Sequence, residues 1–92
     1  MSTTHQSDQY EEIVRSQGDA LNDVIGRHVI QSLGSPADLL KVQVRPLGND
    51  HYRVNVLVGK NAASPRIADS FFLTADFEGK IVTSSPEIVR RY

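Results

Sequence analysis

The sequence contains no cysteine among its 92 residues. This absence excludes disulfide bonds, thiol nucleophiles, iron–sulfur clusters and cysteine-based zinc sites. Long apolar runs are also missing, because no uninterrupted run exceeds three residues, and a bilayer span needs roughly 20. Residues 1–7 lack both the basic start and the apolar run of a signal peptide. The sequence therefore predicts a cytoplasmic protein without a membrane span.

Charge of either sign is not in excess, because ten Lys and Arg residues stand against eleven Asp and Glu residues, for a net charge of −1. A uniformly basic nucleic-acid clamp is therefore excluded. The charge is nevertheless polarised along the chain. Residues 1–38 carry six acidic and two basic residues, whereas residues 39–92 carry eight basic and five acidic ones. We expect an acidic first half and a basic second half.

The length allows a single small domain over residues 1–92, with a thin core. Apolar residues of the first half follow the three-four spacing of one helical face, which predicts a helix over about 8–33. Ser7 is placed to cap its start, and Gly34 is placed to end it. The apolar positions are Tyr10, Ile13, Val14, Leu21, Val24, Ile25, Val29 and Leu33.

Gly18 is the weak point of this helix, because glycine in a helix interior costs about 1 kcal/mol relative to alanine. We therefore expect either one helix bent near Gly18 or a short helix followed by a longer one over 19–33. Residues 1–7 are predicted to be disordered.

The second half changes to a period of two, which is typical of strands. Two runs of alternating apolar and polar residues flank Gly48-Asn49-Asp50, and this arrangement predicts a hairpin with a three-residue loop. All apolar pairs then share one face of the sheet, as a consistent register requires. The expected pairs are Val44 with Val54, Val42 with Val56 and Leu40 with Val58.

Two further strands are predicted over 67–75 and 80–84, joined by a turn that ends at Gly79. This turn would pair Ala75 with Ile81 and Leu73 with Thr83. Residues 87–92 form a C-terminal tail. The predicted fold class is α+β, with an N-terminal amphipathic helix packed on a four-stranded antiparallel β-meander.

Enzymatic motifs are not found in the sequence. The three histidines, His5, His28 and His51, lack metal-ligand spacing, and neither a nucleophile elbow nor a phosphate loop is present. His28 falls at the edge of the apolar stripe and is interpreted as a packing residue. We therefore expect no catalytic residue, no cofactor and no metal, and the chain is predicted not to be an enzyme.

The sheet face away from the helix, hereafter the outer sheet face, carries basic residues. If Val44 lies opposite Val54, then Arg45 lies opposite Arg53, with Lys41 further along the same surface. Like charges placed opposite each other are mildly destabilising, and an anion bound between them relieves the repulsion. Lys41, Arg45 and Arg53 are therefore candidate anion-binding residues, and the alternative is a solvated basic face.

The same alternation directs three apolar residues, Leu57, Phe72 and Val82, toward the outer sheet face. Three apolar residues on adjacent strands can form one patch, which is typical of an interaction surface. Either residues 87–92 fold back over this patch, or a second subunit covers it. Leu57, Phe72 and Val82 are therefore candidate interface residues.

The resulting prediction is a non-enzymatic protein-interaction or homodimerising module that uses the outer sheet face. The alternative is an anion-binding or nucleic-acid-binding domain that uses the basic residues of that face. Phe72 is the single aromatic residue expected there, which is poor provision for base stacking. A protein partner or a second copy of the chain is therefore favoured over nucleic acid.

Overall fold

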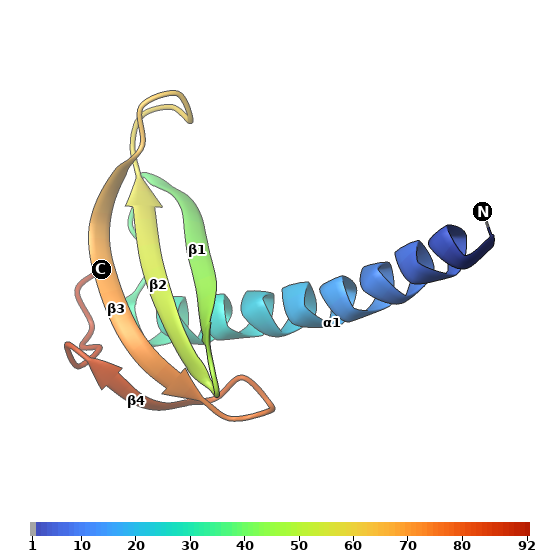
Figure 1. Cartoon of the computed structure of the whole chain (residues 1–92). Coiled ribbons are helices and arrows are strands. Elements are labelled where there is room, and N and C mark those ends of the chain that lie inside the picture. The colour runs from blue at the N-terminus through green and yellow to red at the C-terminus, as the bar shows by residue number, and fades with distance from the viewer. Residues whose placement is uncertain (1) are drawn as a thin grey trace.

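The computed structural model describes the backbone of residues 2–92 and the side chains of residues 18–92. The chain forms one helix and then four strands, which pair in sequence order as a single antiparallel sheet. The sheet is curved, and the helix crosses its concave face (Figure 1). The predicted α+β fold is confirmed. The elements are α1 (Ser2–Leu33), β1 (Leu39–Gly48), β2 (His51–Val58), β3 (Arg66–Ala75) and β4 (Ile81–Ser85).

Helix α1 continues through Gly18, which is exposed. Apart from its chain neighbours and its own helix backbone, no described atom lies within 4 Å of the position a Cβ would take there. The alternative of two separate helices is therefore wrong. The helix ends at Leu33 as predicted, where Gly34 takes a φ of +91° and its N–H donates to the carbonyl of Ile30 at 2.8 Å. Two predictions concern residues 1–7, namely their disorder and the cap at Ser7. These positions lie outside residues 18–92, whose side chains are described, so both stay predictions.

The core lies between α1 and the two central strands. Each fully buried aliphatic side chain contributes about 1.5–3 kcal/mol through the apolar area removed from water. The inward residues of the edge strand β1, Val42 and Val44, are only half-buried, so the core is covered unevenly. The buried apolar residues are Ile25, Val29, Leu33, Val54, Val56, Val58, Phe71, Leu73 and Ala75.

The β1–β2 register confirms two of the three predicted apolar pairs, Val44 with Val54 and Val42 with Val56. The third is wrong, because Val58 pairs with Leu39 instead of Leu40. A bulge after Leu39 leaves Leu40 without a cross-strand partner. Leu39 consequently packs against the core, while Leu40 is exposed.

The hairpin turn also differs from the prediction in a way that leaves the register intact. Gly48 pairs with His51, so the loop has two residues, Asn49 and Asp50, with φ of 42° and 66°. Positive φ at both positions is the backbone of a type I′ turn, which matches the twist of the strands. The predicted loop was one residue longer. Leu47 compensates for the difference, because it forms a bulge between the pairs Pro46–Tyr52 and Gly48–His51 and leaves the rest of the register unchanged.

Strand β4 contains a further bulge. Ala75 pairs with Ile81 as predicted, but the expected pair of Leu73 with Thr83 is wrong. Thr83 pairs with Thr74, and Ser84 takes the place opposite Leu73. Val82 is the extra residue of the bulge and has no partner across the strand.

The turn between β3 and β4 rests on the helix. His28 donates a hydrogen bond from Nδ1 to the carbonyl of Gly79 at 2.6 Å. A Cβ on Gly79 would lie 2.7 Å from Cγ1 of Val24, so only glycine fits between the turn and the helix. The packing role predicted for His28 agrees with this contact.

The C-terminal tail returns to the end of the helix. The carbonyl of Leu33 accepts hydrogen bonds from the backbone N–H groups of Arg91, at 2.8 Å, and Tyr92, at 3.2 Å. The side chains of both residues also bind Asp69 of β3. Ile88 packs against the core. The alternative in which the tail covers the outer sheet face is therefore wrong.

Candidate functional site

The central row of the outer sheet face contains two arginines and a phenylalanine. Arg45 lies opposite Arg53, as predicted, and Arg53 lies opposite Phe72 on the next strand. The guanidinium carbon of Arg53 is 5.2 Å from the centroid of the Phe72 ring, which is a cation–π distance. Phe72 keeps 52% of its surface exposed. The row thus combines an open aromatic ring with two positive charges that repel each other.

A row of three polar side chains runs next to it across β1, β2 and β3. Ser70 donates from its hydroxyl to Oδ1 of Asn55 at 2.7 Å. Asn55 donates in turn from Nδ2 to Oε1 of Gln43 at 3.3 Å. These bonds hold the three side chains in one arrangement, so this part of the face is preorganised.

The predicted anion-binding residues do not form one cluster. Arg45 and Arg53 are brought together, whereas Lys41 lies opposite Leu57, on the far side of the polar row. Gln43 therefore separates Lys41 from the arginine pair along β1. The anion-binding potential of the face is concentrated at Arg45 and Arg53.

The three predicted interface residues do not form one patch either. Leu57 lies opposite the exposed Ile67, and the polar row separates this pair from Phe72. Val82 sits in the bulge of β4, outside the row that pairs Phe72 with Ser85. Phe72 is therefore the centre of the site, and Leu57 and Val82 lie at separate places around it.

A hollow of about 290 Å³ adjoins Phe72 on the outer sheet face. Leu47 borders it and is exposed because the bulge at the end of β1 displaces it from the ladder. On another side, the hydroxyls of Thr74 and Thr83 form a hydrogen bond of 2.7 Å. Leu47 could not be selected from the sequence, since a bulge leaves no signal in the alternation of residues.

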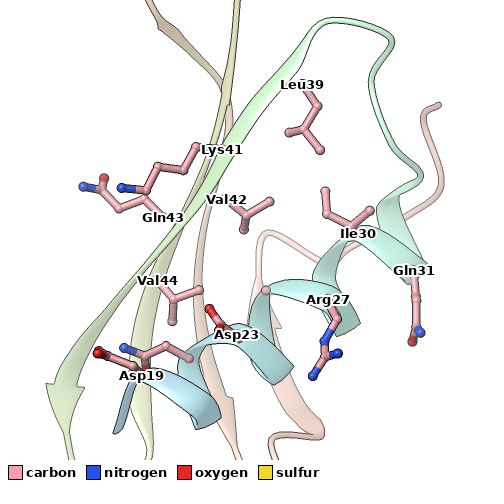
Figure 2. A pocket seen from close by; sticks show the side chains of 12 residues that line it. Asp19, Asp23, Arg27, Ile30, Gln31, Leu39, Lys41, Val42, Gln43 and Val44 are labelled. Carbon is pink, nitrogen blue, oxygen red and sulfur yellow. The ribbon is translucent and has the colours of Figure 1, made fainter. Parts of the chain in front are cut away.

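A second, larger depression lies on the concave side, between α1 and the edge strand β1, with a volume of about 980 Å³. Val42 and Val44 point into it from β1, and Lys41 and Gln43 point the other way (Figure 2). Asp19, Asp23 and Arg27 line it from the helix. We call this depression the α1–β1 groove. The alternation of apolar residues gives no sign of this groove, because it does not determine how far the helix lies from the edge strand.

The residues described offer no centre for metal chemistry. Within residues 18–92, no three His, Asp or Glu side chains group in a way that could hold a metal ion. His28 and His51 each place Nδ1 2.6 Å from a backbone carbonyl oxygen, of Gly79 and Asn49 respectively. Among these residues no buried side-chain nitrogen or oxygen lacks a hydrogen-bond partner.

The helix of the described chain is not apolar enough along its length to cross a membrane. Its residues Ile25, Val29 and Leu33 pack in the core against the sheet.

Comparison with known protein families finds no matching family model, and comparisons with curated proteins and with solved structures find no match either.

Proposed function

We propose that this domain is a non-enzymatic protein-interaction module and that it binds a protein partner through the outer sheet face. The observation that carries the proposal is the environment of Phe72. Its ring is half-exposed, supports the guanidinium of Arg53 and borders a hollow. Aromatic residues and arginine are the residue types that most often dominate the binding energy of protein interfaces.

The chemistry of the site favours a partner segment that carries a carboxylate next to an apolar side chain. A carboxylate between Arg45 and Arg53 accepts charge-assisted hydrogen bonds and removes the repulsion between the two guanidinium groups. An apolar side chain beside it fills the hollow that Phe72 and Leu47 border. A second copy of the chain suits this face poorly, because a two-fold contact centred on the site would bring two arginine pairs together.

The competing occupant is single-stranded RNA, whose phosphates also suit two arginines. Base stacking, however, needs free aromatic faces, and Arg53 already lies over the ring of Phe72. We therefore favour the acidic protein segment, and RNA binding is a result that would overturn the proposal.

The test is a titration of the ¹⁵N-labelled protein, followed by amide chemical shifts, with a random copolymer of glutamate and tyrosine as the acidic apolar probe. A poly(U) titration at the same ionic strength represents RNA. The binding variants are Arg45→Gln with Arg53→Gln, and Phe72→Ser. Lys60→Gln with Arg66→Gln removes the same charge from exposed positions outside the site and is the matched control.

We expect the copolymer to shift the amides around Arg53 and Phe72. Both binding variants should weaken this titration about tenfold, a change of about 1.4 kcal/mol in binding free energy. The control should bind like the parent. Tighter binding of poly(U), or equal weakening by the control, would overturn the proposal.

A further inference from the structure

The face of α1 that borders the α1–β1 groove carries a charge pattern that is complementary to itself. Asp19, Asp23, Arg27 and Gln31 recur at every fourth position, and all four are exposed. Residues four apart lie on one side of a helix, about 6 Å from each other along its axis. This row of four residues, hereafter the groove row, is acidic toward the N-terminus and basic or neutral toward the C-terminus.

Within the described residues, the ion pairs join Asp38 to Arg66, Glu78 to Lys80, and Asp69 to Arg91. Asp23 and Arg27 take no part in them. Both charges are therefore available to a molecule that enters the groove.

Two copies of the groove row fit each other when they run antiparallel. Asp23 of one copy then lies opposite Arg27 of the second copy, and the symmetric contact forms at the same time. Asp19 lies opposite Gln31 of the second copy, which can donate hydrogen bonds to a carboxylate. A two-fold axis thus produces two ion pairs and two hydrogen-bonded pairs from one surface.

The floor of the groove supplies apolar area for such a contact. It is lined by four half-buried apolar residues, Ile30, Leu39, Val42 and Val44. The inward valines of β2, in contrast, are fully buried: Val54, Val56 and Val58. A molecule seated in the groove would remove the remaining apolar surface of these four residues from water, which is favourable. The charged row then flanks an apolar centre, as in many protein interfaces.

The edge of β1 is unsuited to an added strand. It carries Lys41, Arg45 and Pro46, and bulges occur at Leu40 and Leu47. Charged residues, proline and bulges are features by which natural edge strands avoid pairing with other chains. An extended peptide added to β1 is therefore a poorer occupant of the groove than a second helix.

We infer that the α1–β1 groove is the contact surface of a symmetric homodimer, in which α1 of each copy lies antiparallel in the groove of the other. This surface is separate from the outer sheet face. Each copy would thus dimerise on its concave side and keep Phe72 free for the protein partner proposed above.

The test is sedimentation velocity of the purified chain over a range of concentrations, with charge-reversal variants of the groove row. Asp23→Arg and Arg27→Asp each place two like charges opposite each other in the dimer. The double variant, with both changes, restores opposite charges. Glu87→Arg and Lys60→Asp make the same two changes of net charge at exposed positions away from the groove and are the matched controls.

We expect the parent to form dimers. Each single reversal should weaken the dimer at least about tenfold, and the double variant should recover most of the loss, as a double-mutant cycle of directly paired residues requires. The controls should dimerise like the parent. Circular dichroism verifies that the variants keep the helix, which exposed substitutions leave intact.

Three results would overturn the inference. The first is a parent that remains a monomer at millimolar concentration. The second is a double variant that is no better than the single ones. The third is a dimer that Phe72→Ser dissociates while the groove variants do not, because that dimer uses the outer sheet face.

Discussion

His28 and Gly79 are 51 positions apart in the sequence, yet Nδ1 of His28 donates a 2.6 Å hydrogen bond to the carbonyl of Gly79. The bond joins the helix to the turn between β3 and β4, at a place where Gly79 is buried. Removal of this bond leaves a buried carbonyl without a partner.

We expect His28→Phe to lower the free energy of unfolding by about 1–3 kcal/mol, because an unpaired buried carbonyl loses the free energy of its hydration. Urea denaturation measures the change. His51→Phe is the matched control, since His51 makes a bond of the same length, to the carbonyl of Asn49, in an exposed turn. Equal losses in the two variants would contradict the structural role of His28.

Gly79→Ala should destabilise the fold by about 2–3 kcal/mol, because it combines an unfavourable positive φ with a collision. The φ of Gly79 is +82°, and a Cβ there would lie 2.7 Å from Cγ1 of Val24. At Gly48, where φ is +107°, a Cβ would meet no described atom within 4 Å apart from its chain neighbours. Gly48→Ala therefore measures the backbone cost alone. The difference between the melting temperatures of Gly79→Ala and Gly48→Ala therefore measures the cost of the collision with Val24.

Asp50→Gly should raise the free energy of unfolding by about 0.5 kcal/mol, because glycine adopts positive φ without the steric cost of a Cβ. Asp50 has a φ of 66° in the two-residue turn. Asp50→Ala, which keeps a Cβ, should lower the stability. Chemical denaturation of the two variants and the parent ranks their free energies of unfolding. An alanine variant more stable than the glycine variant would contradict the type I′ turn.

The pH dependence of stability should reveal the contact between Tyr92 and Asp69. The hydrogen bond that the Tyr92 hydroxyl donates to Asp69, at 2.9 Å, together with desolvation, raises the pKa of Tyr92. The folded chain thus holds this proton more tightly than the unfolded chain, where the pKa is about 10. The resulting stabilisation is fully present below that pH and is lost as pH rises through the folded pKa.

Denaturation of the parent and of Tyr92→Phe between pH 7 and 11.5 tests this effect. The parent should be the more stable protein at neutral pH, and the difference should shrink above about pH 10. Two curves that stay parallel over the whole range would show that the hydroxyl of Tyr92 makes no specific contact in solution.

The period of the apolar residues predicted the helix, the four strands and the β1–β2 pairing, because burial of one face imposes that period. It could not predict the bulges at Leu40, Leu47 and Val82. A bulge changes the partner of each later residue without changing the residue types. For this reason Leu39 took the place opposite Val58 that was expected for Leu40, and Thr83 paired with Thr74 instead of Leu73.

The candidate site was predicted where it depends on register alone, as in the pair of Arg45 and Arg53. The patch of Leu57, Phe72 and Val82 failed because the polar row and the β4 bulge separate its members. The α1–β1 groove depends on how far the helix lies from the edge strand. Packing between elements determines that distance, and local sequence patterns do not.

The contacts of α1 with the β3–β4 turn and with the tail also impose an order on folding during synthesis. The helix is synthesised first, but Gly79 and Arg91, which His28 and Leu33 contact, are added only after β3 and β4 respectively. The apolar stripe of the helix therefore stays without its native cover while the strands are made. The native contacts of α1 therefore form only after β3, β4 and the tail have left the ribosome, and until then its apolar stripe stays accessible to chaperones.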